Sequence, residues 1–281
     1  MTAKRTRGRK SAKKSSNNSL KSIVVAFLAV ILVAGLIWAI NNTETSRQSD
    51  NPTIACEDLL KVVAPGNIDE QIVDYTGFTV SFNESLRIPN YVTYELTASE
   101  TDGEETRMRK FLQDPNVAGC PEHKDYTNSG YDRGHMAPAA DMKWSKDAMR
   151  DCFYLTNICP QNQKLNREAW QALEEKTRAW AVRDGKLIVI VGPIVSNHPQ
   201  RLASGIAIPE GFFKVLLATN VEPMRAIAFI YKNQSGQKNM SQQAVSIDSV
   251  EEITGLDFFS SLPDEKETPL EKSCNFNAWN N

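Results

Sequence analysis

The alternation of apolar and polar residues predicts a β-rich core in the middle and C-terminal parts of the chain. Two segments, 77–83 and 91–97, contain the alternating or apolar, β-branched and aromatic residues that are typical of strands. Three further runs, 187–191, 212–218 and 225–231, are apolar almost throughout, which favours central strands that are buried in a sheet. We therefore predict an α+β fold, in which a central, mostly antiparallel sheet is flanked by helices.

One long helix is predicted over about residues 164–182, where apolar side chains recur at helical spacing. Asn166, Trp170 and Glu174 follow one another at intervals of four, so they are expected along one side of that helix. A short helix is predicted within 56–63. The predicted loops are the charged or polar segments 98–110 and 232–242.

The N-terminal region has a different pattern. Residues 1–22 carry eight Lys or Arg and no acid, and residues 23–40 follow as 18 uncharged positions. A helix of that length spans about 27 Å, close to the hydrocarbon thickness of a bilayer. We predict a basic cytoplasmic tail at 1–22, a transmembrane signal-anchor at 23–40, a flexible polar stalk at 41–55 and a folded domain at 56–281.

The position of the basic residues predicts the orientation of this anchor. Because they precede the apolar run, the tail is expected to stay in the cytoplasm and the domain to be extracytoplasmic, on the periplasmic or cell-surface side. The alternative is a cleaved signal peptide, which would make the protein secreted. An uncleaved anchor is favoured because the apolar run is long and residues 38–42, Trp-Ala-Ile-Asn-Asn, form a poor cleavage site.

The charge of the folded part does not by itself attract a polyanion. The chain has 32 basic and 34 acidic residues, and because residues 1–40 hold eight bases and no acids, residues 41–281 hold 24 and 34, a net charge of −10. Binding of a nucleic acid would therefore depend on a local basic patch. The candidate residues for this patch are Arg107, Arg109, Lys110, Lys124, Arg133, Lys143, Lys146, Lys164 and Arg167.

Cysteine and histidine are too few and too scattered for a zinc site. The five cysteines all follow the apolar run, and an odd number leaves at least one of them unpaired within a monomer. No Cys or His cluster has the spacing of zinc ligands. Cys159 is interpreted as a small buried thiol rather than a nucleophile.

The densest group of chemically useful residues is Tyr-Asp-Arg-Gly-His-Met-Ala-Pro at 131–138. His135 can take a proton from water near neutral pH, and Arg133 offers a planar fork of donors to a phosphate. Gly134 is interpreted as a tight turn beside the histidine. Further on, Asn166 and Glu174 supply oxygen atoms for a hard cation and its waters. Together these residues suit the hydrolysis of a phosphodiester.

Asp-Arg-Gly-His at 132–135, with an asparagine 31 residues after the histidine and a glutamate eight residues later, resembles the DNA/RNA non-specific endonuclease family. These are the ββα-metal nucleases with a DRGH motif, which include mitochondrial endonuclease G. The segments 154–161 and 165–174 are similar to the family's metal-helix region, and the similarity extends over about 72–262. The resemblance implies the ββα-metal nuclease fold for the domain at 56–281.

The resemblance also implies a role for each site residue. His135 would be the general base, and Asn166 the single direct protein ligand of Mg²⁺, which Mn²⁺ could replace. Glu174 would hold water on the metal, while Arg133 and Arg107 would clamp the phosphate. Asn157 is carried over as a further residue of the catalytic set that holds its geometry. Asp132 would orient its neighbours without a chemical step.

The resemblance implies DNA and RNA as substrates, contacted through phosphates, so little sequence discrimination is expected. A homodimer is a further hypothesis for the assembly. Taken without the family, Asn166 is better interpreted as a polar residue that satisfies free amides at a helix start. The alternative function is a catalytically inactive, membrane-tethered nucleic-acid-binding protein, which the intact His135, Asn166, Glu174 and Arg133 disfavour.

Overall fold

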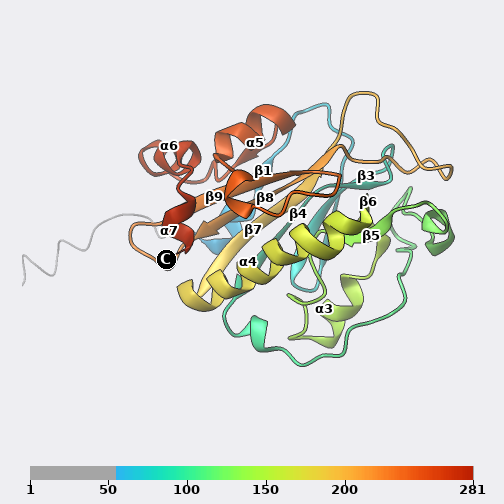
Figure 1. The fold of residues 1–281 in the computed structure, drawn as a ribbon, viewed down its shortest axis with the longest axis horizontal. Helices are drawn as coiled ribbons and strands as arrows, with labels where there is room; N and C mark the ends of the chain where they lie inside the picture. Colours follow the sequence, from blue (N-terminus) through green and yellow to red (C-terminus); the bar gives the residue numbers. More distant parts are fainter. Residues whose placement is uncertain (1–54, 281) are drawn as a thin grey trace, which may run out of the picture. The chain divides into compact units, whose positions relative to one another are not determined.

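The computed structural model describes residues 55–280, and its centre is a seven-stranded sheet in the order β10-β9-β8-β7-β4-β3-β2 (Figure 1). Every neighbouring pair of these strands is antiparallel, which confirms the predicted antiparallel sheet. The strands are β2 (Gln71–Tyr75), β3 (Phe78–Asn83), β4 (Ile88–Thr97), β7 (Lys186–Ile194), β8 (Gly211–Ala218), β9 (Arg225–Lys232) and β10 (Ala244–Val245).

Side chains that alternate along the central strands divide the interior into two cores. On β7, Leu187, Val189 and Val191 belong to one buried cluster, whereas Ile188 and Ile190 belong to the other. This follows from the period of two in a strand, which sends successive side chains to opposite faces. Both faces of β7 are therefore covered, as its nearly continuous apolar sequence predicts.

Different helices cover the two faces. The first core includes Trp170 and Trp180 from the long helical segment, which crosses the sheet in Figure 1, while the second includes Ile247, Val250 and Leu270. The helices concerned are α4 (Gln171–Asp184), α5 (Ile247–Thr254), α6 (Asp264–Lys272) and α7 (Phe276–Asn280).

A separate pair of short strands lies outside the main sheet. β5 (Asp132–His135) and β6 (Ile158–Gln161) are antiparallel, with Gly134 opposite Cys159 and His135 opposite Ile158. The chain between them forms α3 (Lys146–Asp151) and η3 (Leu155–Asn157). The other elements are α2 (Cys56–Leu59), β1 (Val62–Val63), β11 (Asp257–Phe258) and the 3₁₀ turns η1 (Glu100–Asp102), η2 (His123–Tyr126) and η5 (Met240–Gln242).

The predicted long helix is present and has an irregular start. It begins with a π-helical segment, η4 (Leu165–Trp170), continues as α4 and ends before Gly185, whose φ of 85° suits glycine. The predicted tail at 1–22, anchor at 23–40 and most of the stalk lie outside the described residues. Among residues 55–280, no helix has the length and apolar character needed to cross a membrane.

Candidate active site

A pocket of about 320 Å³ gathers five of the six predicted site residues. Its wall is formed by β5, the loop after β5, η4 and α4, together with a side chain from the loop after η1. The predicted residues that line it are Arg107, Arg133, His135, Asn166 and Glu174. Residues far apart in the sequence therefore meet in one polar cavity, at the edge of the core that α4 covers.

His135 is held in a strand, and the predicted glycine turn beside it is wrong. Gly134 lies within β5, and a Cβ atom at this position would be 2.2 Å from Oε1 and 2.7 Å from Cβ of Gln161. The side chain of Gln161 is fully buried, so it has little room to move away. Glycine is required here because the two strands approach closely, not because the chain turns.

Aromatic rings enclose the imidazole of His135. The rings of Phe111 and Phe153 have their centroids 5.2 and 4.9 Å from it, and the histidine is 7% exposed. Burial, and then the positive charge of Arg107, lower the pKa of His135 to about 3. The imidazole is therefore neutral at physiological pH, so one of its nitrogens is free to accept a proton.

Two arginines from different parts of the chain reach the pocket. Arg133 donates from Nη2 to the carbonyl of His123 at 2.8 Å, and its guanidinium lies 5.6 Å from the rings of Phe111 and Tyr126. Arg107 is exposed, with its guanidinium 5.2 Å from the ring of Phe153. Two fixed positive charges beside a neutral histidine suit a bound phosphate.

Asp132 fixes the direction of the Asn166 amide. The Nδ2 of Asn166 donates to Oδ2 of Asp132 at 3.0 Å, and Arg167 donates to both oxygens of the same carboxylate at 2.8 and 2.7 Å. A carboxylate only accepts hydrogen bonds, so it selects the amino group of Asn166 and leaves the amide oxygen available for another partner. The expected orienting role of Asp132 is thus visible as a specific contact.

The π-helical segment sets which helical residues face the pocket. In a regular α-helix, two residues eight apart point about 80° away from each other, because each residue adds about 100°. The wide π turn absorbs one extra residue, which leaves Asn166 and Glu174 nearly in line. Gln171, five positions after Asn166, also lines the pocket, whereas Trp170 is fully buried in the core and does not. The expectation that Trp170 shares this side is therefore wrong.

Glu174 is a half-buried carboxylate among mixed charges. Burial raises its pKa to about 7, and Asp141 adds to the increase, whereas Lys214, Arg178 and Arg107 oppose it. A carboxylate with a pKa near neutrality can exchange protons at physiological pH, which is frequent in functional sites.

The sequence analysis did not identify several charged residues that support this site. Arg178, four residues after Glu174, lines the pocket and donates to Oδ1 of Asp141 at 2.8 Å, and Tyr94 donates to Oδ2 of the same carboxylate at 2.9 Å. Lys214 on β8 is fully buried near them. The spacing of Arg178 from Glu174 was a usable indication; Asp141 and Lys214 gave none, because the fold alone brings them close.

Asn157 supports the site from behind and does not line the pocket. Its Oδ1 accepts from the backbone N–H of Ala137, and its Nδ2 donates to the carbonyls of Ala137 and Cys152, all at 2.9 Å. The side chain is fully buried. It therefore holds the segment that directly follows His135.

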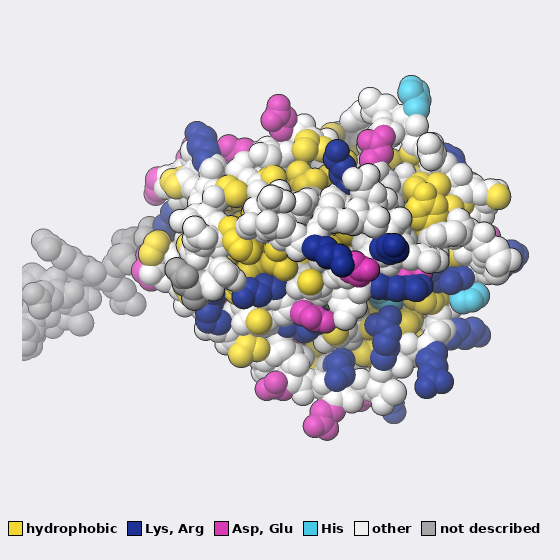
Figure 2. Space-filling model, in the orientation of Figure 1, with side chains coloured by type: hydrophobic (Ala, Val, Ile, Leu, Met, Phe, Trp, Pro, Cys, Tyr) yellow, Lys and Arg dark blue, Asp and Glu magenta, His cyan; other side chains and the backbone are white. Residues whose placement is uncertain are grey.

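Lys and Arg side chains gather on one part of the surface in Figure 2, over the region where α3, α4 and β5 lie in Figure 1. Of the candidate patch residues, Arg107, Arg133 and Arg167 line the pocket. Lys124 forms an exposed ion pair with Glu122. Three arginines of the predicted patch therefore line the pocket. Arg178, which the sequence analysis did not identify, is a fourth.

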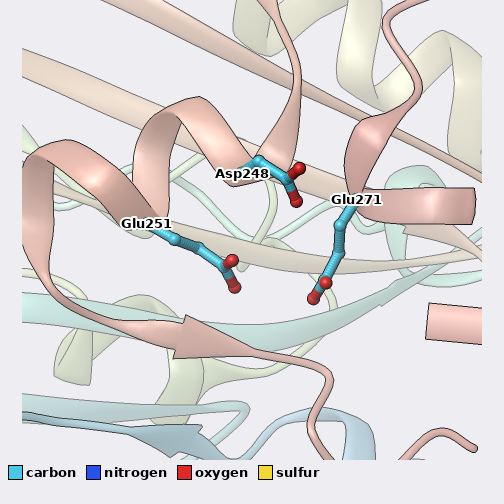
Figure 3. Close-up of side chains that lie close together, drawn as sticks. All are labelled: Asp248, Glu251 and Glu271. Atoms are coloured by element: carbon cyan, nitrogen blue, oxygen red, sulfur yellow. The ribbon is translucent and has the colours of Figure 1, made fainter. Parts of the chain in front are cut away.

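A second cluster of polar groups lies on the other side of the sheet. Asp248 and Glu251 from α5 approach Glu271 from α6, with potential ligand oxygens within 4.8 Å of one another (Figure 3). Burial, and then neighbouring acids, raise the pKa of Glu271 to about 8. The cluster shares no residue with the pocket around His135.

Comparison with known proteins agrees with this geometry. The model of the DNA/RNA non-specific endonuclease family matches residues 56–265. The chain belongs to this family. Among its relatives, the mitochondrial nuclease EXOG of Mus musculus is 32% identical over 208 residues, which cover 67% of this chain and 56% of that protein. The chain thus spans little more than half the length of EXOG.

Other members of the family match over a larger share of their length. The mitochondrial Nuclease 1 of Schizosaccharomyces pombe is 30% identical, with 76% of this chain and 74% of that protein covered. A solved structure of the EndoG/EndoGI complex aligns with a TM-score of 0.65 and 27% identity, over 71% of this chain and 89% of that chain. This likeness supports the mixed fold of a large antiparallel sheet with helices.

Proposed function

We propose that this protein is a Mg²⁺-dependent, sequence-non-specific endonuclease that hydrolyses phosphodiester bonds of DNA and RNA. The observation that carries the proposal is the pocket in which a neutral His135, an oriented Asn166 and two arginines face one another. Family membership supports it, since relatives are named nucleases. The individual roles below follow from the chemistry of these side chains.

The donor atoms of the pocket fit a hard divalent cation. Asp132 turns the amide oxygen of Asn166 away from itself, and Glu174 adds a carboxylate in the same cavity. Oxygen donors of this kind suit Mg²⁺, which keeps most of its waters, and Mn²⁺ as a substitute. When bound, the ion would stabilise the negative charge that develops on the phosphate and the leaving oxygen. Asn166 would hold it directly, and Glu174 through water.

His135 would accept the proton of the attacking water. Its low pKa keeps the imidazole unprotonated, although burial also makes it a weaker base. The negative charge of a bound phosphate favours the imidazolium form and so counteracts burial. Arg133 and Arg107 would bind the phosphate oxygens and stabilise the crowded transition state.

All of these contacts would be made to phosphate, cation and water. None of the assigned residues reads a base edge, so the proposed activity has little sequence preference and acts on both DNA and RNA. The arginines around the pocket would supply the local attraction that an acidic domain otherwise lacks.

The test uses the purified full-length protein with supercoiled plasmid and with single-stranded RNA, each in Mg²⁺ and in chelator. We expect metal-dependent cleavage of both substrates and its loss in Asn166→Ala. Folded protein that binds both substrates and cuts neither would contradict the proposal and favour the inactive, membrane-tethered binding protein. Cleavage of one substrate alone would contradict the proposed breadth.

For the N-terminal region, we propose a transmembrane anchor at 23–40 with the nuclease domain outside the cytoplasm, or a secreted protein if that segment is cleaved. The apolar run and the basic residues before it support this. Membrane fractionation and protease accessibility of the full-length chain would test it. A homodimer stays a prediction, which sedimentation of the purified protein would test.

A further inference from the structure

A second pocket, called the Phe111 pocket below, borders the candidate active site. Its volume is about 440 Å³, within the usual size range of ligand sites. The residues that line it are Thr106, Arg107, Met108, Arg109, Phe111 and Phe153. Arg107 also lines the pocket around His135, so the two cavities meet at this side chain.

Aromatic rings form the partition between the two pockets. The ring centroids of Phe111 and Phe153 lie 5.2 and 4.9 Å from that of His135, and 5.1 Å from each other. Both phenylalanines line the Phe111 pocket, whereas His135 lines the active-site pocket. A group bound in the Phe111 pocket would therefore be separated from the proposed general base by a single layer of rings.

The Phe111 pocket combines an apolar wall with positive charge. Met108 and Phe111 are half-buried and pack against the core under α4, while Arg107 and Arg109 on the same segment are exposed. None of the described residues that line the pocket is acidic. This combination suits a ligand with flat apolar faces that is attached to a negative charge. Nucleotides have this form, and proteins bind them by stacking aromatic rings and guanidinium planes on the bases while cations contact the phosphates.

We propose that the Phe111 pocket is a nucleobase subsite, which takes the base of an unpaired nucleotide beside the phosphate that the active-site pocket binds. The base would lie against Met108 and Phe111, with the guanidinium plane of Arg109 stacked on it. This rests on the proposed function for the position of that phosphate, whereas binding of the base can be measured without cleavage. Contacts to base faces leave the edges unread, so the subsite agrees with a low sequence preference.

A duplex would use this subsite less than a single strand would. Paired bases are stacked on one another inside the double helix, and exposing one of them costs a few kcal/mol. The phosphates of a duplex stay accessible to Arg107 and Arg133, so a duplex would still be bound and cut. The subsite therefore favours unpaired regions of DNA and RNA, which is a preference for the state of the strand and not for its sequence.

The first test measures binding to the full-length protein in chelator, where metal-dependent cleavage does not occur. Fluorescence anisotropy compares a labelled single strand of about 10 nucleotides with a strand of the same length that has abasic sugars throughout. We expect the strand with bases to bind about 5- to 150-fold more tightly, the range that the stacking of one base supplies. Met108→Ala removes part of the wall, and Arg109→Lys keeps the charge but removes the plane. Each should lower this ratio by about fivefold.

Matched variants separate stacking from charge and from folding. Lys110→Ala removes an exposed cation of the same segment that does not line the pocket, so it should weaken both strands alike and leave the ratio unchanged. Met108→Leu keeps an apolar side chain of similar size and should keep the wild-type ratio. Because Arg109 is exposed, Arg109→Lys decides the test even if Met108→Ala does not fold. Equal affinity of the wild type for the two strands would overturn the proposal, as would a ratio that Arg109→Lys leaves unchanged.

The second test is steady-state cleavage, in Mg²⁺, of a single strand and of a duplex with the same sequence. Stacking of the base is present both before and during the reaction, so Arg109→Lys should raise KM for the single strand by about fivefold and keep kcat. KM for the duplex should stay at the wild-type value. An equal rise in KM for both substrates would overturn the preference for unpaired nucleotides.

The outcomes distinguish failure of the subsite from failure of the proposed function. A protein that binds bases through Arg109 but cuts neither strand would keep the subsite and lose the nuclease function. A protein that cuts both strands and binds the abasic strand as tightly as the normal one would keep the nuclease function and lose the subsite.

Discussion

Each face of the central sheet holds a carboxylate whose pKa is raised toward neutrality, but the two carboxylates have different charged neighbours. On the face under α4, burial raises the pKa of Glu174 to about 7 against the opposing effect of three cations. On the face under α5 and α6, the pKa of Glu271 reaches about 8, and every charged neighbour that affects it is an acid. The acids around Glu271 are Glu251, Glu267, Asp248 and Asp257.

A raised pKa is common to both carboxylates, so it does not distinguish them; the charge of their neighbours does. Cations around Glu174 favour its charged form, which is the form that can hold water on a metal ion. Acids around Glu271 favour the protonated form, which can share a proton within the cluster. The first arrangement lies in a pocket with His135 and Asn166, and the second does not.

The largest expected effect is on the cleavage rate, when the proposed base on the face under α4 is removed. His135→Ala should lower the rate of plasmid cleavage by about 10²–10⁴-fold, the usual contribution of a general base. Glu271→Gln, on the opposite face, should cut at the wild-type rate. Circular dichroism would check that both variants are folded. A His135→Ala protein that cuts as fast as the wild type would remove the base assignment.

The second prediction concerns the orientation of Asn166, the proposed metal ligand. Asp132→Ala frees the amide of Asn166, so the Mg²⁺ concentration for half-maximal cleavage should rise by about 10–100-fold. The measurement is a Mg²⁺ titration of the cleavage rate. Asp248→Asn, which removes an acid from the other cluster, serves as the control. Equal Mg²⁺ requirements in Asp132→Ala and wild type would contradict the orienting role.

A smaller effect is expected on stability from the glycine of β5. Gly134→Ala should destabilise the fold by about 1–3 kcal/mol, because the added Cβ meets the buried Gln161. Gly66→Ala is the matched control, since a Cβ there meets no atom within 4 Å. Urea unfolding would compare the two variants. Equal midpoints would argue against the close approach of the strands.

The smallest expected effect is on the pH dependence of stability, through Glu271 on the face under α5 and α6. Because the folded pKa of Glu271 is about 8 and its ordinary value is 4.5, the folded state binds a proton that the unfolded state has released. Stability should therefore fall as pH rises from about 4.5 to 8. Glu271→Gln should flatten this dependence and raise the thermal midpoint by a few degrees at pH 8, roughly 2–4 °C per kcal/mol. The exposed Glu265→Gln is the control; equal slopes in both would contradict the assignment.

Regular elements were predictable from sequence because their patterns are local and repeated. The five predicted strands are present, as is the long helix, and the antiparallel sheet follows from them. The structure adds β2 (Gln71–Tyr75), whose alternate residues are exposed, the pair β5 and β6, and the two-residue strands β1, β10 and β11. Strands of four residues that contain Gly or Pro carry too little pattern to be recognised, which is why 132–135 was interpreted as a turn.

The candidate site was predictable in part. The five pocket residues come from a motif and its spacing, whereas the contact that orients Asn166 depends on a π turn that no sequence rule describes. Asp141 and Lys214 are separated from Glu174 by 33 and 40 positions and meet it only in the fold. Their role is electrostatic, and the charge of a side chain in sequence does not say which carboxylate it will face.

Most of the pocket comes from one continuous stretch of the chain, 132–178, which holds β5, β6, η4 and the first half of α4. Arg107 is the pocket residue from outside this stretch. The charge of Lys214, on β8, acts on Glu174. The proposed base and the proposed metal ligand thus lie on one segment of the chain. The rest of the domain contributes the sheet on which that segment packs and Arg107 in the wall of the pocket.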